Sequence, residues 1–89
     1  HARAVWLGAA LMHHARLHTS PRLRRTLKVL QEAQGELTTY ELSRAADICA
    51  VNSVIAELRE NGAEITCRQA VKDGQRRFYY RLMKSPKGY

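Results

Sequence analysis

The 89-residue sequence predicts one α+β domain, in which three core helices precede a C-terminal β-hairpin and an extra helix lies at the N-terminus. Two observations predict the helices: a start signal at Ser20-Pro21, and apolar residues at helical spacing after it. Strict alternation on both sides of Asp73-Gly74 predicts the hairpin. The expected parts are an N-terminal helix in residues 1–19, the domain in 20–83 and a flexible tail in 84–89.

The first two helices are predicted from apolar spacing and from a cap. Residues 3–17 have apolar side chains on one side of a helix. Ser20 can cap the next helix, and Pro21 is tolerated at its first position because that amide has no helical partner. We expect this helix to run from Pro21 to about Gln34 and to stop at Gly35, burying Leu23, Leu27 and Leu30.

The middle of the chain predicts two more helices separated by a break at residues 47–49. Thr38 or Thr39 caps a short helix that ends near Ala46 and turns Leu42 and Ala45 inward. The next helix spans about residues 50–61, buries Val51, Ile55 and Leu58, and stops at Gly62. Leu37 is a candidate for a short third strand.

The hairpin is predicted from its Asp-Gly turn, which favours pairing of Lys72 with Gln75. Alternation then divides the side chains between two faces. On the core side we expect Ile65, Cys67, Phe78, Tyr80 and Leu82, and on the solvent side Arg68, Arg77, Tyr79 and Arg81. The solvent side is therefore basic.

The order of short helix, turn, longer helix and hairpin resembles the winged helix-turn-helix DNA-binding superfamily, in particular small domains from phages and proteobacteria. The resemblance covers residues 26–82 and rests on Leu37-Thr38, Leu58-Arg59, Gly62, Ile65 and Tyr80-Arg81-Leu82. It implies that helix 50–61 enters the major groove of double-stranded DNA. The hairpin 65–82 would then be a wing on the phosphate backbone.

The charge favours an anionic partner. Fifteen Lys and Arg against eight Asp and Glu give a net charge of +7, with two basic ends around an acidic middle. Nucleic acid is the first expectation, ahead of an anionic membrane surface. The apolar stretch after Arg3 is too short to span a membrane and lacks a signal-peptide cleavage site. Because the chain begins at His1, we expect it to be a piece of a longer protein.

Two groups of residues are predicted to contact DNA. The base contacts are expected from exposed positions early in helix 50–61, namely Asn52, Ser53 and Ala56, of which Asn52 is the best reader because Asn can bond an adenine edge twice. The phosphate contacts are expected from Thr38, Thr39, Arg44, Arg59, Arg68, Lys72, Gln75, Arg76 and Arg77. About five phosphate contacts would give a log-log salt slope of roughly −4 to −5.

The acidic middle is the main objection, since carboxylates repel phosphates. Glu57 and Glu60 fall past the start of helix 50–61, so we expect them to angle away from the groove and pair with Arg59 or Lys28. Phosphate affinity would then come mainly from the hairpin and the N-terminal basic groups.

The cysteines and histidines do not indicate a metal site or a catalytic site. Cys49 and Cys67 fit two reduced, packed thiols, which suits a cytoplasmic protein. His14 and His18 lie four residues apart, yet no further ligand completes a metal site. The sequence predicts no enzyme, cofactor or small-molecule substrate. Because duplex recognition usually takes two half-sites, residues 4–17 are expected to hold a homodimer or a parent-protein contact.

The leading hypothesis is a duplex-DNA-binding domain of a transcriptional regulator or a phage DNA-transaction protein. The chief alternative is a winged helix that acts as a protein-interaction module in a larger assembly, which the acidic middle favours. A third is RNA or single-strand binding, with bases stacked on Tyr79. Exposed aromatic residues look too few in the sequence to favour it.

Overall fold

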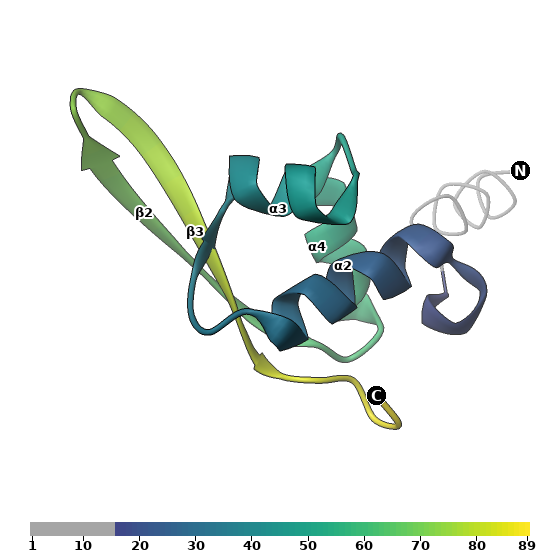
Figure 1. Cartoon of the computed structure of the whole chain (residues 1–89). Coiled ribbons are helices and arrows are strands. Elements are labelled where there is room, and N and C mark those ends of the chain that lie inside the picture. The colour runs from purple at the N-terminus through teal and green to yellow at the C-terminus, as the bar shows by residue number, and fades with distance from the viewer. Residues whose placement is uncertain (1–15) are drawn as a thin grey trace, which may run out of the picture.

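The computed structural model describes residues 16–89, which form an α+β domain with a cluster of helices and a long β-hairpin (Figure 1). The hairpin extends well beyond the helices. The expected N-terminal helix, and the dimer or docking contact assigned to residues 4–17, fall almost entirely outside the described residues. The elements are η1 (Leu17–Thr19), α2 (Pro21–Glu32), β1 (Leu37–Thr38), α3 (Thr39–Ala46), α4 (Val51–Glu60), β2 (Glu64–Lys72) and β3 (Gln75–Lys84).

Helix α2 begins at the predicted signal. Ser20 accepts a hydrogen bond from the Leu23 amide at 3.4 Å, and Pro21 occupies the first turn. The helix ends earlier than predicted, because Ala33 already has an extended backbone and Gly35 lies beyond the end. Its inner face buries Leu23, Thr26, Leu27 and Leu30.

Helix α3 is held by a capping box at Thr38. The Glu41 amide donates to Thr38 Oγ1 at 3.1 Å, and the Thr38 amide donates to Glu41 Oε1 at 2.8 Å. Two orphan amides of the first turn are thereby satisfied. The inward residues are Leu42 and Ala46; the prediction that Ala45 faces inward is wrong, since helical phase leaves it exposed.

Helix α4 packs its apolar side against α2 and the base of the sheet. It buries Val51, Val54, Ile55, Glu57 and Leu58, which includes every apolar residue predicted for its inner face. The chain then turns at Gly62, whose φ of +105° lies in the region that glycine adopts without strain.

The sheet has the order β1-β3-β2 and is antiparallel throughout. The predicted register is confirmed from Lys72 opposite Gln75 down to Ile65 opposite Leu82. Asp73 and Gly74 both have positive φ, at 53° and 76°, as a type I′ turn requires. The short strand β1 adds Leu37 opposite Tyr80, so Leu37 does belong to a third strand.

Only the base of the apolar hairpin face is buried. Ile65 and Tyr80 belong to the core and Leu82 packs against it, whereas Cys67 is exposed and Phe78 is 39% exposed. The expected burial of these two residues is wrong. Phe78 lies two residues nearer the turn than the buried Tyr80, toward the end of the hairpin that extends past the helices (Figure 1). Cys67 is paired with Tyr80 but belongs to β2, which lies at the edge of the sheet. Cys49 is also an exposed free thiol, so neither cysteine is packed as predicted.

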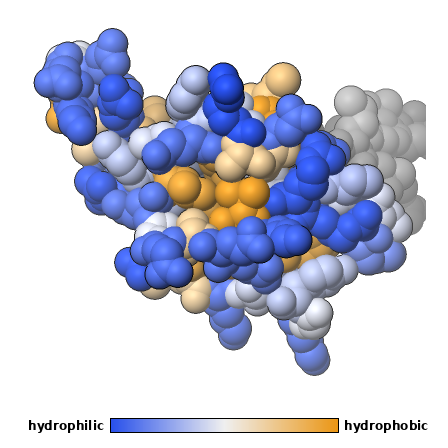
Figure 2. Space-filling model, viewed as in Figure 1, coloured by the Kyte–Doolittle hydropathy of each residue, from blue (hydrophilic) through white to orange (hydrophobic). Residues whose placement is uncertain are grey.

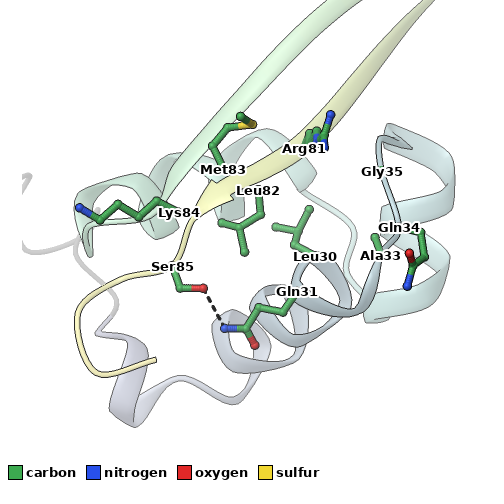
Figure 3. A pocket seen from close by; sticks show the side chains of 10 residues that line it. All are labelled: Leu30, Gln31, Ala33, Gln34, Gly35, Arg81, Leu82, Met83, Lys84 and Ser85. Carbon is green, nitrogen blue, oxygen red and sulfur yellow. Dashed lines mark hydrogen bonds between the residues drawn. The ribbon is translucent and has the colours of Figure 1, made fainter.

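The segment after β3 returns to α2. Gln31 Nε2 donates to Ser85 Oγ and to the Tyr89 carbonyl, both at 3.0 Å, and Pro86 is buried near Gly62. A cleft lies between the end of α2 and the end of β3, with Leu30 and Leu82 at its floor (Figure 3). The segment predicted as a tail thus starts inside β3 and then contacts the helical part of the fold.

Candidate nucleic-acid interface

The exposed side of α4 presents small and polar residues. Asn52, Ser53 and Ala56 are all exposed, as predicted, and the first turn contains no acidic residue. Carboxylates are therefore absent where this helix would first meet an anionic partner.

Asn52 is held in place by the sheet. Its Oδ1 accepts a hydrogen bond from the Tyr80 hydroxyl at 2.8 Å, which joins α4 to β3. Burial raises the pKa of Tyr80, so the hydroxyl stays protonated and remains a donor at neutral pH. An amide oxygen has two acceptor positions, so one remains, together with the Nδ2 donor, to bond an adenine edge.

Several predicted phosphate contacts already have a partner within the domain. Arg68 makes two hydrogen bonds to the Glu36 carboxylate, at 2.9 and 2.7 Å. Arg59 donates twice to the Ile65 carbonyl, at 3.2 and 2.8 Å. Arg44 lies over the Tyr40 ring, 5.7 Å from its centre. Of the three, only Arg68 is paired with a carboxylate among residues 16–89, so its charge is less available to a ligand than the sequence suggested.

The cations at the far end of the hairpin, unlike the three arginines above, have no such partners in the described residues. In the described part of the chain, no ion pair or side-chain hydrogen bond engages Lys72, Arg76 or Arg77. Lys72, Gln75 and Arg76 are exposed and Arg77 is half-buried. Figure 2 shows the end of the hairpin as a mostly hydrophilic projection. These three cations outnumber the one carboxylate in the turn, that of Asp73, so net positive charge lies at the point of the fold that extends furthest from the helices.

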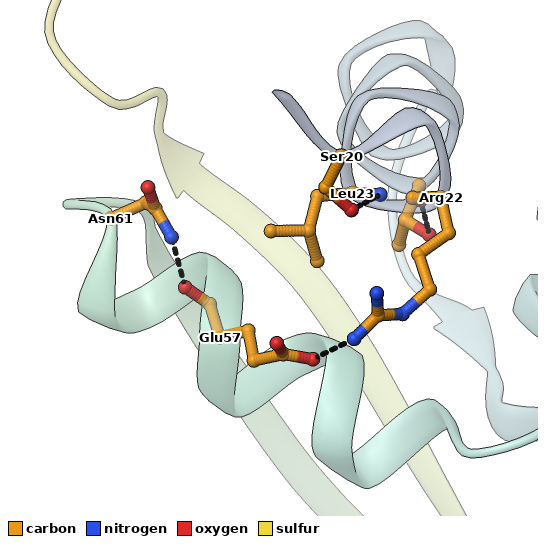
Figure 4. A network of polar contacts seen from close by, with 6 residues as sticks. Ser20, Arg22, Leu23, Glu57 and Asn61 are labelled. Carbon is orange, nitrogen blue, oxygen red and sulfur yellow. Dashed lines mark hydrogen bonds and ion pairs between the residues drawn. The ribbon is translucent and has the colours of Figure 1, made fainter. Parts of the chain in front are cut away.

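Glu57, an acidic residue of α4 that would repel phosphates, faces inward. Glu57 is buried, and its Oε1 accepts a hydrogen bond at 2.5 Å from Nη2 of Arg22, which lies on α2 (Figure 4). The partner found for Glu57 is Arg22, which lies on α2 as the expected Lys28 does, whereas the expected Arg59 donates to the Ile65 carbonyl. Its carboxylate is kept away from the exposed side of α4, as the hypothesis requires.

The predicted contacts fall into two groups around β3. Two adjoining hollows between the start of α3 and the hairpin are lined by Thr38, Thr39, Lys72, Gln75, Arg76 and Arg77, among others. Another hollow, between α4 and the hairpin, is lined by Asn52 and Arg59. Because strand neighbours alternate, Arg77 and Tyr80 point to opposite faces of β3. The base-reading candidates and Arg77 therefore lie on different sides of the sheet.

Tyr40 was not predicted as a site residue. It is 68% exposed and lines both hollows beside α3, together with Arg77. Its position in the first turn of α3, after the Thr38 cap, was the only sequence signal. The approach of α3 to the hairpin depends on the β1–β3 pairing.

No family model, curated protein or solved structure matches this chain. Within residues 16–89 there is no cluster of three or more residues that could hold a metal ion. No helix in this same part of the chain has the length and apolar character needed to cross a bilayer.

Proposed function

We propose that this chain is a winged helix-turn-helix domain that binds double-stranded DNA, with α4 in the major groove and the hairpin on the phosphate backbone. The main support is a set of three cations, Lys72, Arg76 and Arg77, which have no ion-pair partner in the described residues. They lie at the far end of a hairpin that packs beside α4. Positive charge in such a position recruits phosphates.

Helix α4 supplies the second part of the proposal. Its exposed Asn52, Ser53 and Ala56 include an amide that reads adenine and a methyl that fits thymine. Glu57, which would repel phosphates, is buried against Arg22. In this mode α4 gives selectivity and the hairpin gives most of the affinity.

The parent would be a transcriptional regulator or a phage DNA-transaction protein that works in the cytoplasm. Because one such domain covers a single half-site, duplex recognition would use a homodimer or a parent-protein contact through residues 4–17.

A mobility-shift titration with a random-sequence duplex pool at two salt concentrations tests the proposal. We expect binding at low salt that weakens steeply at the higher concentration, together with enrichment of a common sequence after repeated selection. Binding that does not respond to salt would contradict the proposal.

A protein-interaction module is the second candidate, and exposed apolar residues on the hairpin favour it. Val71 is 69% exposed and Phe78 is 39% exposed, on the side of the sheet that faces α4. Such a module would show no salt-sensitive affinity for duplex DNA, so the same titration separates the two functions.

A further inference from the structure

The groove between the start of α3 and the hairpin combines exposed aromatic rings with uncompensated cations. Tyr40 forms part of one wall, while Arg77 and Lys72 come from the strands opposite. Tyr79 lies in the same groove, on the face of β3 that points away from α4. Aromatic rings beside cations are the arrangement that proteins use to bind unpaired nucleotides.

Tyr79 is in contact with Arg68. The Arg68 guanidinium lies 4.5 Å from the centre of the Tyr79 ring, and Arg68 is itself fixed by two hydrogen bonds to Glu36. These contacts favour one orientation of the Tyr79 ring. A rigid aromatic loses little conformational entropy when a base is placed against it.

Tyr40 is the more accessible ring. It is 68% exposed, and its one ring contact in the described residues is Arg44, which lies a turn further along α3 and donates to the Tyr40 hydroxyl at 3.3 Å. Tyr40 is not part of the hydrophobic core. Burial within the domain therefore does not explain a large aromatic side chain at this position.

The charges in the groove indicate how a strand would lie. Glu41, whose Oε1 caps the Thr38 amide, and Asp73 in the turn are the acidic residues that line it. Glu41 disfavours a phosphate next to α3. On the strand side, Nε of Arg77 is shielded from solvent and has no acceptor among residues 16–89, so this guanidinium has unused hydrogen-bonding capacity.

We propose that this groove binds a single-stranded DNA segment, with a base stacked on Tyr40 and the sugar-phosphate chain along Arg77 and Lys72. Stacking of this kind requires an open base face, which a base pair inside a duplex does not offer. The site is distinct from the reading face of α4 and goes beyond the proposed duplex binding, although both would draw on the hairpin cations.

The test is fluorescence anisotropy with a labelled oligo-dT and an abasic oligonucleotide of the same length, which has the same charge but no bases. We expect Tyr40→Ala to weaken oligo-dT binding about 10-fold, the effect of losing one stacked base. Binding of the abasic strand should be unchanged, and Tyr40→Phe should retain oligo-dT binding because it keeps the ring.

Tyr89→Ala is the matched control, since Tyr89 is 50% exposed and lies by α2, away from the groove. It should bind oligo-dT like the unaltered chain. The proposal is overturned if Tyr40→Ala binds oligo-dT normally, or if it weakens the abasic strand equally.

Duplex affinity measured on the same variants separates the two proposals. Tyr40→Ala should bind duplex DNA as the unaltered chain does, whereas Arg76→Ala/Arg77→Ala should not. Failure of oligo-dT binding alone would remove this inference and leave the duplex proposal in place.

Discussion

Replacing Arg76 and Arg77 together with Ala should remove most of the salt dependence of duplex binding. Three cations at the end of the hairpin lack partners within the described residues: these two and Lys72. Each phosphate contact contributes about −0.9 to the slope of log K against log salt, so the expected slope is roughly −2.7. Affinity should then fall about 40-fold between about 50 and 200 mM salt.

The double replacement leaves one of these contacts. Its slope should be about −0.9, and its affinity should fall only about 3-fold over the same salt range. Fluorescence anisotropy with a labelled duplex at four or more salt concentrations measures both slopes. This slope is smaller than the one expected from the sequence because Arg68 and Arg59 already have hydrogen-bond partners in the domain.

The control removes the same charge elsewhere. Lys28→Ala/Lys87→Ala lowers the net charge equally at two exposed positions away from the hairpin. Its slope should stay near that of the unaltered chain. If both double variants lose the same slope, binding follows net charge alone, and the reasoning from the hairpin is refuted.

Three further predictions address the reading helix, the core and one ion pair. Asn52→Ala should relax preference at one base position by about 1–3 kcal/mol in selections from random duplexes; an unchanged preference would remove Asn52 as a reader. Leu58→Ala, at a fully buried position, should cost about 2–5 kcal/mol in urea unfolding, and a smaller loss would argue against the described packing. The hydrogen bonds from Arg68 lower the pKa of Glu36 below 4.5, so the stabilisation from this pair is present above that pH and is lost as acid protonates the carboxylate. Glu36→Gln should therefore unfold with less acid dependence, and an identical pH profile would exclude a contribution from the pair.

Local patterns predicted the hairpin well. The Asp73-Gly74 turn and strict alternation fixed the register, because a slip by one residue would move Tyr80 from the core to the opposite face. The Ser20 and Thr38 caps likewise located the starts of two helices. These features depend on residues close in sequence, so no knowledge of the tertiary arrangement was needed.

Ion pairs between residues far apart in the sequence could not be predicted. Arg22 and Glu57 are 35 residues apart, and Arg68 and Glu36 are 32 apart. Which of 15 cations meets which of eight acids depends on how the elements pack. The sequence therefore indicated candidate phosphate contacts, but not which of them have partners within the domain.

The sequence also did not indicate which part of the hairpin the helices cover. Alternation showed which residues share a face but not which strand lies at the edge of the sheet, so Cys67 was wrongly placed in the core. Alternation also gave no information on the groove beside α3, which Tyr40 and Arg77 both line although they lie far apart in the sequence. This candidate site exists only because the fold places α3 beside the hairpin.

The most direct measurement is an NMR titration of the ¹⁵N-labelled chain with a duplex taken from the selection. If α4 and the hairpin contact one duplex, backbone amides of residues 50–56 and 72–77 should shift together and saturate at the same duplex concentration. Shifts confined to α2 and residues 85–89, or none at saturating duplex, would contradict this mode of binding.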